Sequence, residues 1–157
     1  ISSSSDDTNL DMAILFKDKL KTKHLCSDLS CYNVENIKTL NGETYAVSLL
    51  NFPKIVTNDN FVYAFIMNDT NCNSSIYTRE GNAEGCGQVY VDINGIKPPN
   101  TLGKDIFIYS VNKYNVAPAG SDENNNWENN CDINSTASAN GSECAGRAIA
   151  ESKINYF

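Results

Sequence analysis

Hydrophobic positions near the start of the chain recur at helical spacing. Leu10, Ile14 and Leu20 fall mostly on one face of a helix, and acidic residues come early while lysines come late, an order that suits the helix dipole. The pattern predicts an amphipathic helix over residues 6–25, with His24 in its last turn. A lone histidine at a helix end, with no partner in view, is a poor candidate for catalysis.

Farther along the chain the pattern changes to that of β-strands. Residues 88–93 alternate apolar and polar positions, and residues 61–67 form the longest unbroken apolar run. A membrane-spanning helix needs about 20 apolar residues, so this run is too short to cross a bilayer. Four strands are predicted, over residues 44–50, 61–67, 88–93 and 106–111.

The order of these elements indicates the fold class. Strands joined by turns and loops, without crossover helices, favour an antiparallel sheet. A long amphipathic helix beside such a sheet forms an α+β layer pair. We therefore expect one domain over residues 1–157, with the helix at about 6–25, an antiparallel sheet of about four strands at about 44–111 and a disulfide-clipped loop region at about 112–157.

The composition restricts the possible partners. The chain has 157 residues, with 12 Lys+Arg against 19 Asp+Glu, which gives a net charge of −7. This acidic balance argues against nucleic acid as a direct partner, because binding phosphates needs clustered lysine and arginine. No signal peptide is visible, and the opening at Ile1 with a serine run predicts a trimmed start, with further sequence upstream in the natural protein.

The six cysteines indicate the compartment. An even count in an acidic, Asn-rich chain favours three disulfides and export to an oxidising space. A zinc site is disfavoured, because no pair of cysteines has two intervening residues and the chain has one histidine. Six cysteines can pair in many ways, and the sequence does not decide among them. We predict the sequential pairing, in which each bond closes a short polar loop: Cys26–Cys31, Cys72–Cys86 and Cys131–Cys144.

Catalytic patterns are weak. The serines have no well-placed histidine base, and the chain has neither a Gly-x-Ser-x-Gly elbow nor a Gly-rich phosphate loop. Carboxylates are plentiful, so the sequence leaves an acid/base pair open. We expect the protein not to be an enzyme.

One turn has two interpretations. Asp92, Asn94 and Asp105 offer hard oxygen ligands of the kind that calcium prefers, although their spacing is not that of an EF-hand. In the other interpretation Asn94-Gly95 forms a turn with positive φ, and the two aspartates accept backbone N–H bonds. We expect no other cofactor.

Trp127 lies in an almost wholly polar segment and also has two interpretations. It can pack into the core or anchor its loop, or it can be an exposed aromatic that contacts a ligand or a surface during adhesion.

Three stretches of the chain, taken together, resemble a known pattern. The first is the opening amphipathic helix. The second, residues 87–95, reads Gly-Gln-Val-Tyr-Val-Asp-Ile-Asn-Gly and is followed by Pro99-Asn100, Gly103, Asp105 and Phe107. The third reads Cys-Ala-Gly-Arg-Ala-Ile at 144–149 and continues to Ile-Asn-Tyr at 154–156. Together they resemble the soluble part of type IV pilin-like proteins, the family of pilins, minor pilins and type II secretion pseudopilins.

The resemblance implies a structural subunit of an extracellular filament, either a type IV pilus-like fimbrium or a type II secretion pseudopilus. The family's Phe-Thr-Leu-Ile-Glu-like start and long apolar helix would lie upstream of Ile1. Through that missing helix, subunits would associate with one another and with other pilin or pseudopilin subunits. The same helix would be the only link to the membrane, holding the precursor in the inner membrane before the head reaches the cell surface.

The resemblance also implies roles for particular residues. Leu10, Ile14 and Leu20 would hold the helix against the sheet, and the Cys131–Cys144 bond would correspond to the family's clipped C-terminal region. A different class of function remains as an alternative, namely a stand-alone secreted binding or adhesion module that binds its ligand without any polymer.

Overall fold

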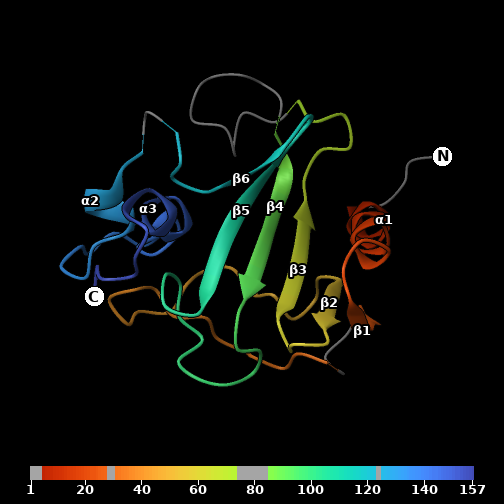
Figure 1. The fold of residues 1–157 in the computed structure, drawn as a ribbon, viewed down its shortest axis with the longest axis horizontal. Coiled ribbons are helices and arrows are strands. Elements are labelled where there is room, and N and C mark those ends of the chain that lie inside the picture. Colours follow the sequence, from red (N-terminus) through yellow and green to blue (C-terminus); the bar gives the residue numbers. More distant parts are fainter. Residues whose placement is uncertain (1–4, 28–30, 74–84, 123–124) are drawn as a thin grey trace.

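The structure is a computed structural model that describes residues 5–27, 31–73, 85–122 and 125–157 (Figure 1). It has an α+β fold built on an antiparallel sheet, and each strand pairs with the strand that follows it in the sequence. Across the described ranges the sheet has six strands: β1 (Thr22–Cys26), β2 (Lys54–Thr57), β3 (Val62–Met67), β4 (Gly85–Asp92), β5 (Ile106–Asn112) and β6 (Val116–Pro118). The helices are α1 (Ser5–Lys17), α2 (Trp127–Asn130) and α3 (Cys144–Glu151).

The opening helix is shorter than its periodicity predicts. It ends at Lys17, and residues 22–25, predicted as its last turn, instead belong to the edge strand β1. Leu25 pairs with Ile55 of β2, and Cys26 is buried at the strand's end. Pairing with β2 therefore overrides the local helical spacing. His24 is exposed on this strand rather than at a helix end.

Three of the four predicted strands are confirmed, as β3, β4 and β5. The remaining predicted strand, residues 44–50, is wrong, because the only strand pairing in these residues is an isolated bridge between Lys38 and Thr44. The sheet has six strands rather than about four, since β1, β2 and β6 were not predicted. The β2 strand was missed because it begins with a lysine: the Lys54 side chain is fully buried and its Nζ donates to the Leu50 and Phe52 carbonyls, at 2.8 and 2.6 Å.

One face of the sheet is covered by α1, which lies beside β1, β2 and β3 (Figure 1). Its contact face carries Asn9, Ala13 and Phe16; the Phe16 ring lies 5.1 Å from that of Phe65 on β3. Asn9 is buried, and its Oδ1 accepts the backbone N–H of Met67.

The predicted contact residues of this helix need correction. Ile14 is 43% exposed, and Leu10 and Leu20 are half-buried. A polar residue, Asn9, lies on the contact face and an apolar residue faces water, so a hydrophobic pattern places the face incorrectly.

The other face of the sheet is covered by an irregular segment, residues 31–52. Its side chains Tyr32, Ile37 and Leu49 are buried against the sheet residues Val62 and Tyr90. The sheet thus has a layer of buried side chains on each face, one under the helix and one under this segment, and a third buried cluster of the described residues lies around the Cys131–Cys144 disulfide.

The predicted disulfide pairing is confirmed at all three bonds: Cys26–Cys31, Cys72–Cys86 and Cys131–Cys144. The C-terminal region is more regular than the loop predicted over 112–157, because β6, α2 and α3 lie within it. No helix in the described ranges is long and apolar enough to span a membrane.

Candidate functional site

The turn between β4 and β5 brings Asp92, Asn94 and Asp105 together. Asp92 is the last residue of β4 and is 1% exposed. Its Oδ2 accepts the Tyr32 hydroxyl at 2.8 Å, and its Oδ1 accepts the Asn94 backbone N–H at 3.0 Å. Tyr32 belongs to the segment that covers the sheet, so this carboxylate ties that segment to the turn.

Asp105, directly before β5, organises the other side of the turn. Its carboxylate accepts the backbone N–H groups of Thr101 and Asn100, at 2.6 and 2.8 Å, and the Asn94 side-chain amide at 3.1 Å. These bonds are the ones that the turn interpretation predicts. Gly95 has a φ of +71°, which is the positive φ expected after Asn94.

The environment of Asp92 disfavours its charged form. Burial raises the pKa of Asp92 to about 6, and the nearby Asp105 carboxylate adds to the effect, while hydrogen bonds from Asn94 and Tyr32 oppose it. Burial, with Asp92 beside it, also raises the pKa of the Tyr32 hydroxyl. The Tyr32–Asp92 pair is therefore a proton-binding group inside the fold.

The calcium interpretation stays a prediction. Two buried amide oxygens beside the carboxylates, Asn94 Oδ1 and Asn100 Oδ1, have no hydrogen-bond partner. The carboxylates themselves, however, are taken up by N–H and O–H donors, and no group of three or more acidic, histidine or cysteine side chains in the described ranges could hold a metal ion. The turn interpretation accounts for more of the observed contacts.

We therefore expect the melting temperature to be the same in millimolar calcium and in excess chelator, as measured by thermal unfolding. Calcium would have to compete with the donors that already bond the carboxylates of Asp92 and Asp105. Magnesium at the same concentration serves as the ionic-strength control. A rise in the melting temperature with calcium but not magnesium would establish the metal site instead.

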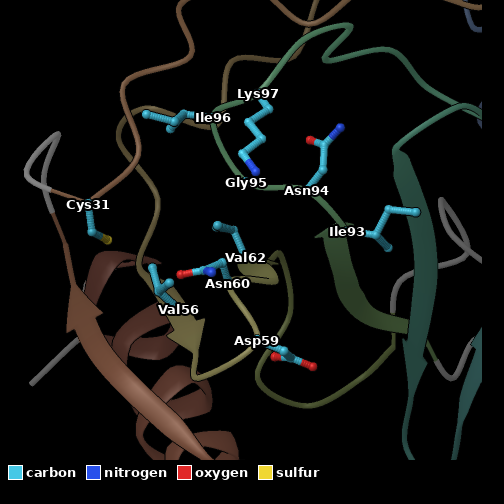
Figure 2. A pocket seen from close by; sticks show the side chains of 10 residues that line it. All are labelled: Cys31, Val56, Asp59, Asn60, Val62, Ile93, Asn94, Gly95, Ile96 and Lys97. Carbon is cyan, nitrogen blue, oxygen red and sulfur yellow. The ribbon is translucent and has the colours of Figure 1, made fainter.

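A pocket of about 450 Å³ opens beside this turn (Figure 2). The apolar part of its wall comes from Val56 and Val62 of the sheet and from Ile93 and Ile96, which follow β4. Asp59 and Lys97 add one charge of each sign, and Cys31, also in the wall, is held in a disulfide. The wall thus provides no nucleophile with a base beside it.

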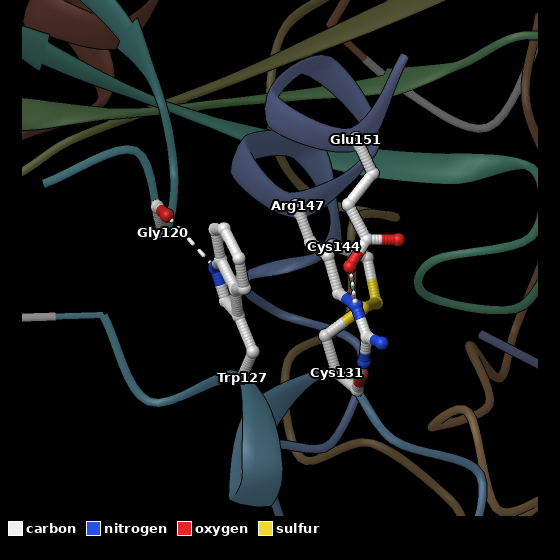
Figure 3. A network of polar contacts seen from close by, with 6 residues as sticks. All are labelled: Gly120, Trp127, Cys131, Cys144, Arg147 and Glu151. Carbon is white, nitrogen blue, oxygen red and sulfur yellow. Dashed lines mark hydrogen bonds and ion pairs between the residues drawn. A yellow bond between two sulfur atoms is a disulfide. The ribbon is translucent and has the colours of Figure 1, made fainter. Parts of the chain in front are cut away.

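The C-terminal clip is built around Trp127 and the Cys131–Cys144 disulfide (Figure 3). The indole Nε1 donates to the Gly120 carbonyl at 2.9 Å, and the half-buried ring packs against the cluster that contains both cysteines. These contacts are those of a loop anchor, the first of its two interpretations. Contact with an external surface through the exposed part of the ring stays a prediction.

Arg147 of α3 joins this clip to the helix. Its Nη1 donates to the Cys131 carbonyl at 2.6 Å, and its Nε lies 3.0 Å from Glu151 Oε1 one turn later (Figure 3). The clip is a hydrogen-bonded unit that holds α3 in place.

Among the described residues, the most exposed large aromatic is one that the hydrophobic pattern did not single out. Tyr114, between β5 and β6, is 77% exposed. Its position between two strand-forming segments, next to Asn115, is the signal that could have placed it at a hairpin tip.

Comparison with known proteins adds no assignment: no family model matches the chain, and neither the curated proteins nor the solved structures include a significant match.

Proposed function

We propose that the chain is the globular head of a filament subunit, of the kind found in type IV pili or type II secretion pseudopili. The observation that carries this proposal is the position of the opening helix: α1 packs on β1–β3 at one edge of the molecule (Figure 1). A helix that continued upstream could leave the head without disturbing the core.

Two further features support the proposal. The three disulfides fasten an acidic, Asn-rich surface, which is the chemistry expected of a head exposed outside the cell. The β4–turn–β5 unit and the C-terminal clip occupy the two stretches whose sequences resemble those of prepilin-like proteins. Neither the pocket nor the Asp92 turn offers a reacting group with a base, so a structural role accounts for the described residues better than catalysis does.

The test is the coding sequence upstream of Ile1 together with the fate of filaments in the cell. We expect a short leader followed by about 20 apolar residues, and antibody against the head should label filaments under the electron microscope. Deleting the gene should abolish or shorten those filaments. A conventional cleavable signal peptide, with filaments unchanged on deletion and glycan binding by the isolated domain, would favour the secreted binding module instead.

A further inference from the structure

The charged residues of this acidic chain are unevenly distributed. Residues 17–24 hold four lysines and one acid, a net charge of +3, and the rest of the chain holds 8 basic and 18 acidic residues, a net charge of −10. A second segment, residues 114–146, has five acids and neither lysine nor arginine. Such separation of charge along one chain creates surfaces of opposite potential.

The four lysines of this first segment lie together at one end of the fold. Lys17 ends α1, Lys19 and Lys21 lie in the connection that follows, and Lys23 is on the edge strand β1; all four side chains are exposed. Beside them Ile14 and Leu15 of α1 are 43% and 57% exposed. We call these six residues the basic end.

Of the acidic residues in the segment 114–146, those that the structure describes lie at the opposite end. Glu128 of α2 is exposed, Asp122 and Asp132 are partly exposed, and Ile133 beside them is 42% exposed. We call the described residues of this segment, 114–122 and 125–146, the acidic end. Glu143 contributes less to this surface, because it is buried and accepts bonds from Asn126 and Asn130.

The sheet separates the two ends. Its strands run in order from β1 to β6, with α1 beside the first three strands and α3, which contacts α2, beside β5 (Figure 1). Six strands span roughly 24 Å, about three Debye lengths at physiological salt. The opposite charges therefore do not neutralise one another within a molecule, but they would do so between molecules set end to end.

We propose that the acidic end of one copy binds the basic end of the next copy, in a head-to-tail series. The two surfaces differ, so the contact is heterologous and repeats along a row rather than closing as a twofold dimer. Ile14 and Leu15 on one side, and Ile133 on the other, supply apolar area within a charged rim. This inference rests on the proposed function, since a filament subunit must meet its copies in sequence.

A second copy is favoured over an anionic lipid surface because the complementary charge is present on the same molecule. A lysine on an edge strand, here Lys23 on β1, also opposes strand-to-strand pairing, so the contact we propose is made by side chains rather than by extension of the sheet.

The test uses two charge-reversed variants of the purified chain. Lys19→Glu/Lys23→Glu changes the net charge of residues 17–24 from +3 to −1, and Glu128→Lys/Asp132→Lys changes that of residues 114–146 from −5 to −1. In sedimentation velocity at low salt the unmodified chain should self-associate, and each variant alone should associate at least about tenfold more weakly.

An equimolar mixture of the two variants should recover association, because each then meets a complementary end. Lys97→Glu/Lys113→Glu, which changes the same net charge at exposed lysines elsewhere, is the matched control and should behave as the unmodified chain does.

Three results would overturn the inference: no self-association of the unmodified chain at low salt, association that the reversals leave unchanged, or binding to phosphatidylglycerol vesicles in place of binding between copies. The outcome is separable from that of the proposed function. If filaments formed normally from subunits that carry the charge reversals, only the proposed contact between the basic and acidic ends would be refuted. If the protein associated in a charge-dependent way but had no apolar segment upstream, only the filament proposal would be refuted.

Discussion

Replacing Asp92 with asparagine is expected to stabilise the protein progressively as the pH rises. The folded chain holds a proton on Asp92 up to about pH 6, whereas an unfolded aspartate releases it near pH 3.8. Protonation therefore favours the folded state; this stabilisation is complete below pH 3.8 and is lost as the pH rises through about 6. The difference between the two pKa values corresponds to roughly 3 kcal/mol.

Asp92→Asn removes the titrating group and keeps the hydrogen bonds. The amide oxygen can still accept the Asn94 N–H, and the amide nitrogen can donate to the Tyr32 hydroxyl oxygen, reversing the bond seen with the carboxylate. Denaturant unfolding from about pH 4 to about pH 7.5 should show the free energy of unfolding of the variant, minus that of the unmodified chain, rising by roughly 3 kcal/mol.

A matched change of net charge tests the cause. Asp11→Asn alters an exposed carboxylate on α1 and should give a difference that stays nearly constant over the same pH range. If the Asp92→Asn difference were equally flat, or if Asp11→Asn rose as steeply, the buried Tyr32–Asp92 pair would not be the source of the pH dependence.

The central strands could be predicted because burial on both faces leaves a direct mark on the sequence. β3 is an apolar run, while β4 and β5 are rich in branched and aromatic residues. β2 leaves no such mark, since its first residue is a lysine whose charge is met by carbonyls at the end of the covering segment. Three-dimensional contacts of this kind cannot be read from hydrophobic spacing.

The contacts of the candidate site likewise include some that the sequence predicts and some that it does not. The Asn94-Gly95 turn was predictable because its residues set the backbone conformation locally. The role of Tyr32 was not, because it is 60 residues away from Asp92 along the chain and meets it only when the covering segment packs on the sheet. The sequential disulfides were predictable because each closes a short loop, whereas the helix α3 that begins at Cys144 was not.

Replacing Gly146 with alanine is expected to destabilise the protein by about 3 kcal/mol, although alanine is the better helix former by about 1 kcal/mol. Gly146 lies in α3 where the helix meets the Gly120 backbone, and its N–H donates to the Ala119 carbonyl at 2.8 Å. A Cβ here would overlap the Gly120 carbonyl group and the Ser121 nitrogen. Backbone cannot swing aside as a flexible side chain can.

The opposing surface is fixed as well. Gly120 has a φ of +83°, its carbonyl accepts the Trp127 indole, and a Cβ on Gly120 would itself lie 2.6 Å from the Glu143 carbonyl oxygen. Relief of the overlap would therefore move α3 away and strain the Trp127 anchor and the Cys131–Cys144 clip together.

Denaturant unfolding measures the loss of stability. Ala150→Gly, at an exposed position of the same helix, is the control for helix propensity, with an expected cost of about 1 kcal/mol. A Gly146→Ala variant as stable as the unmodified chain would mean that α3 is not held this closely, and that helix propensity rather than packing sets the stability of the C-terminal region.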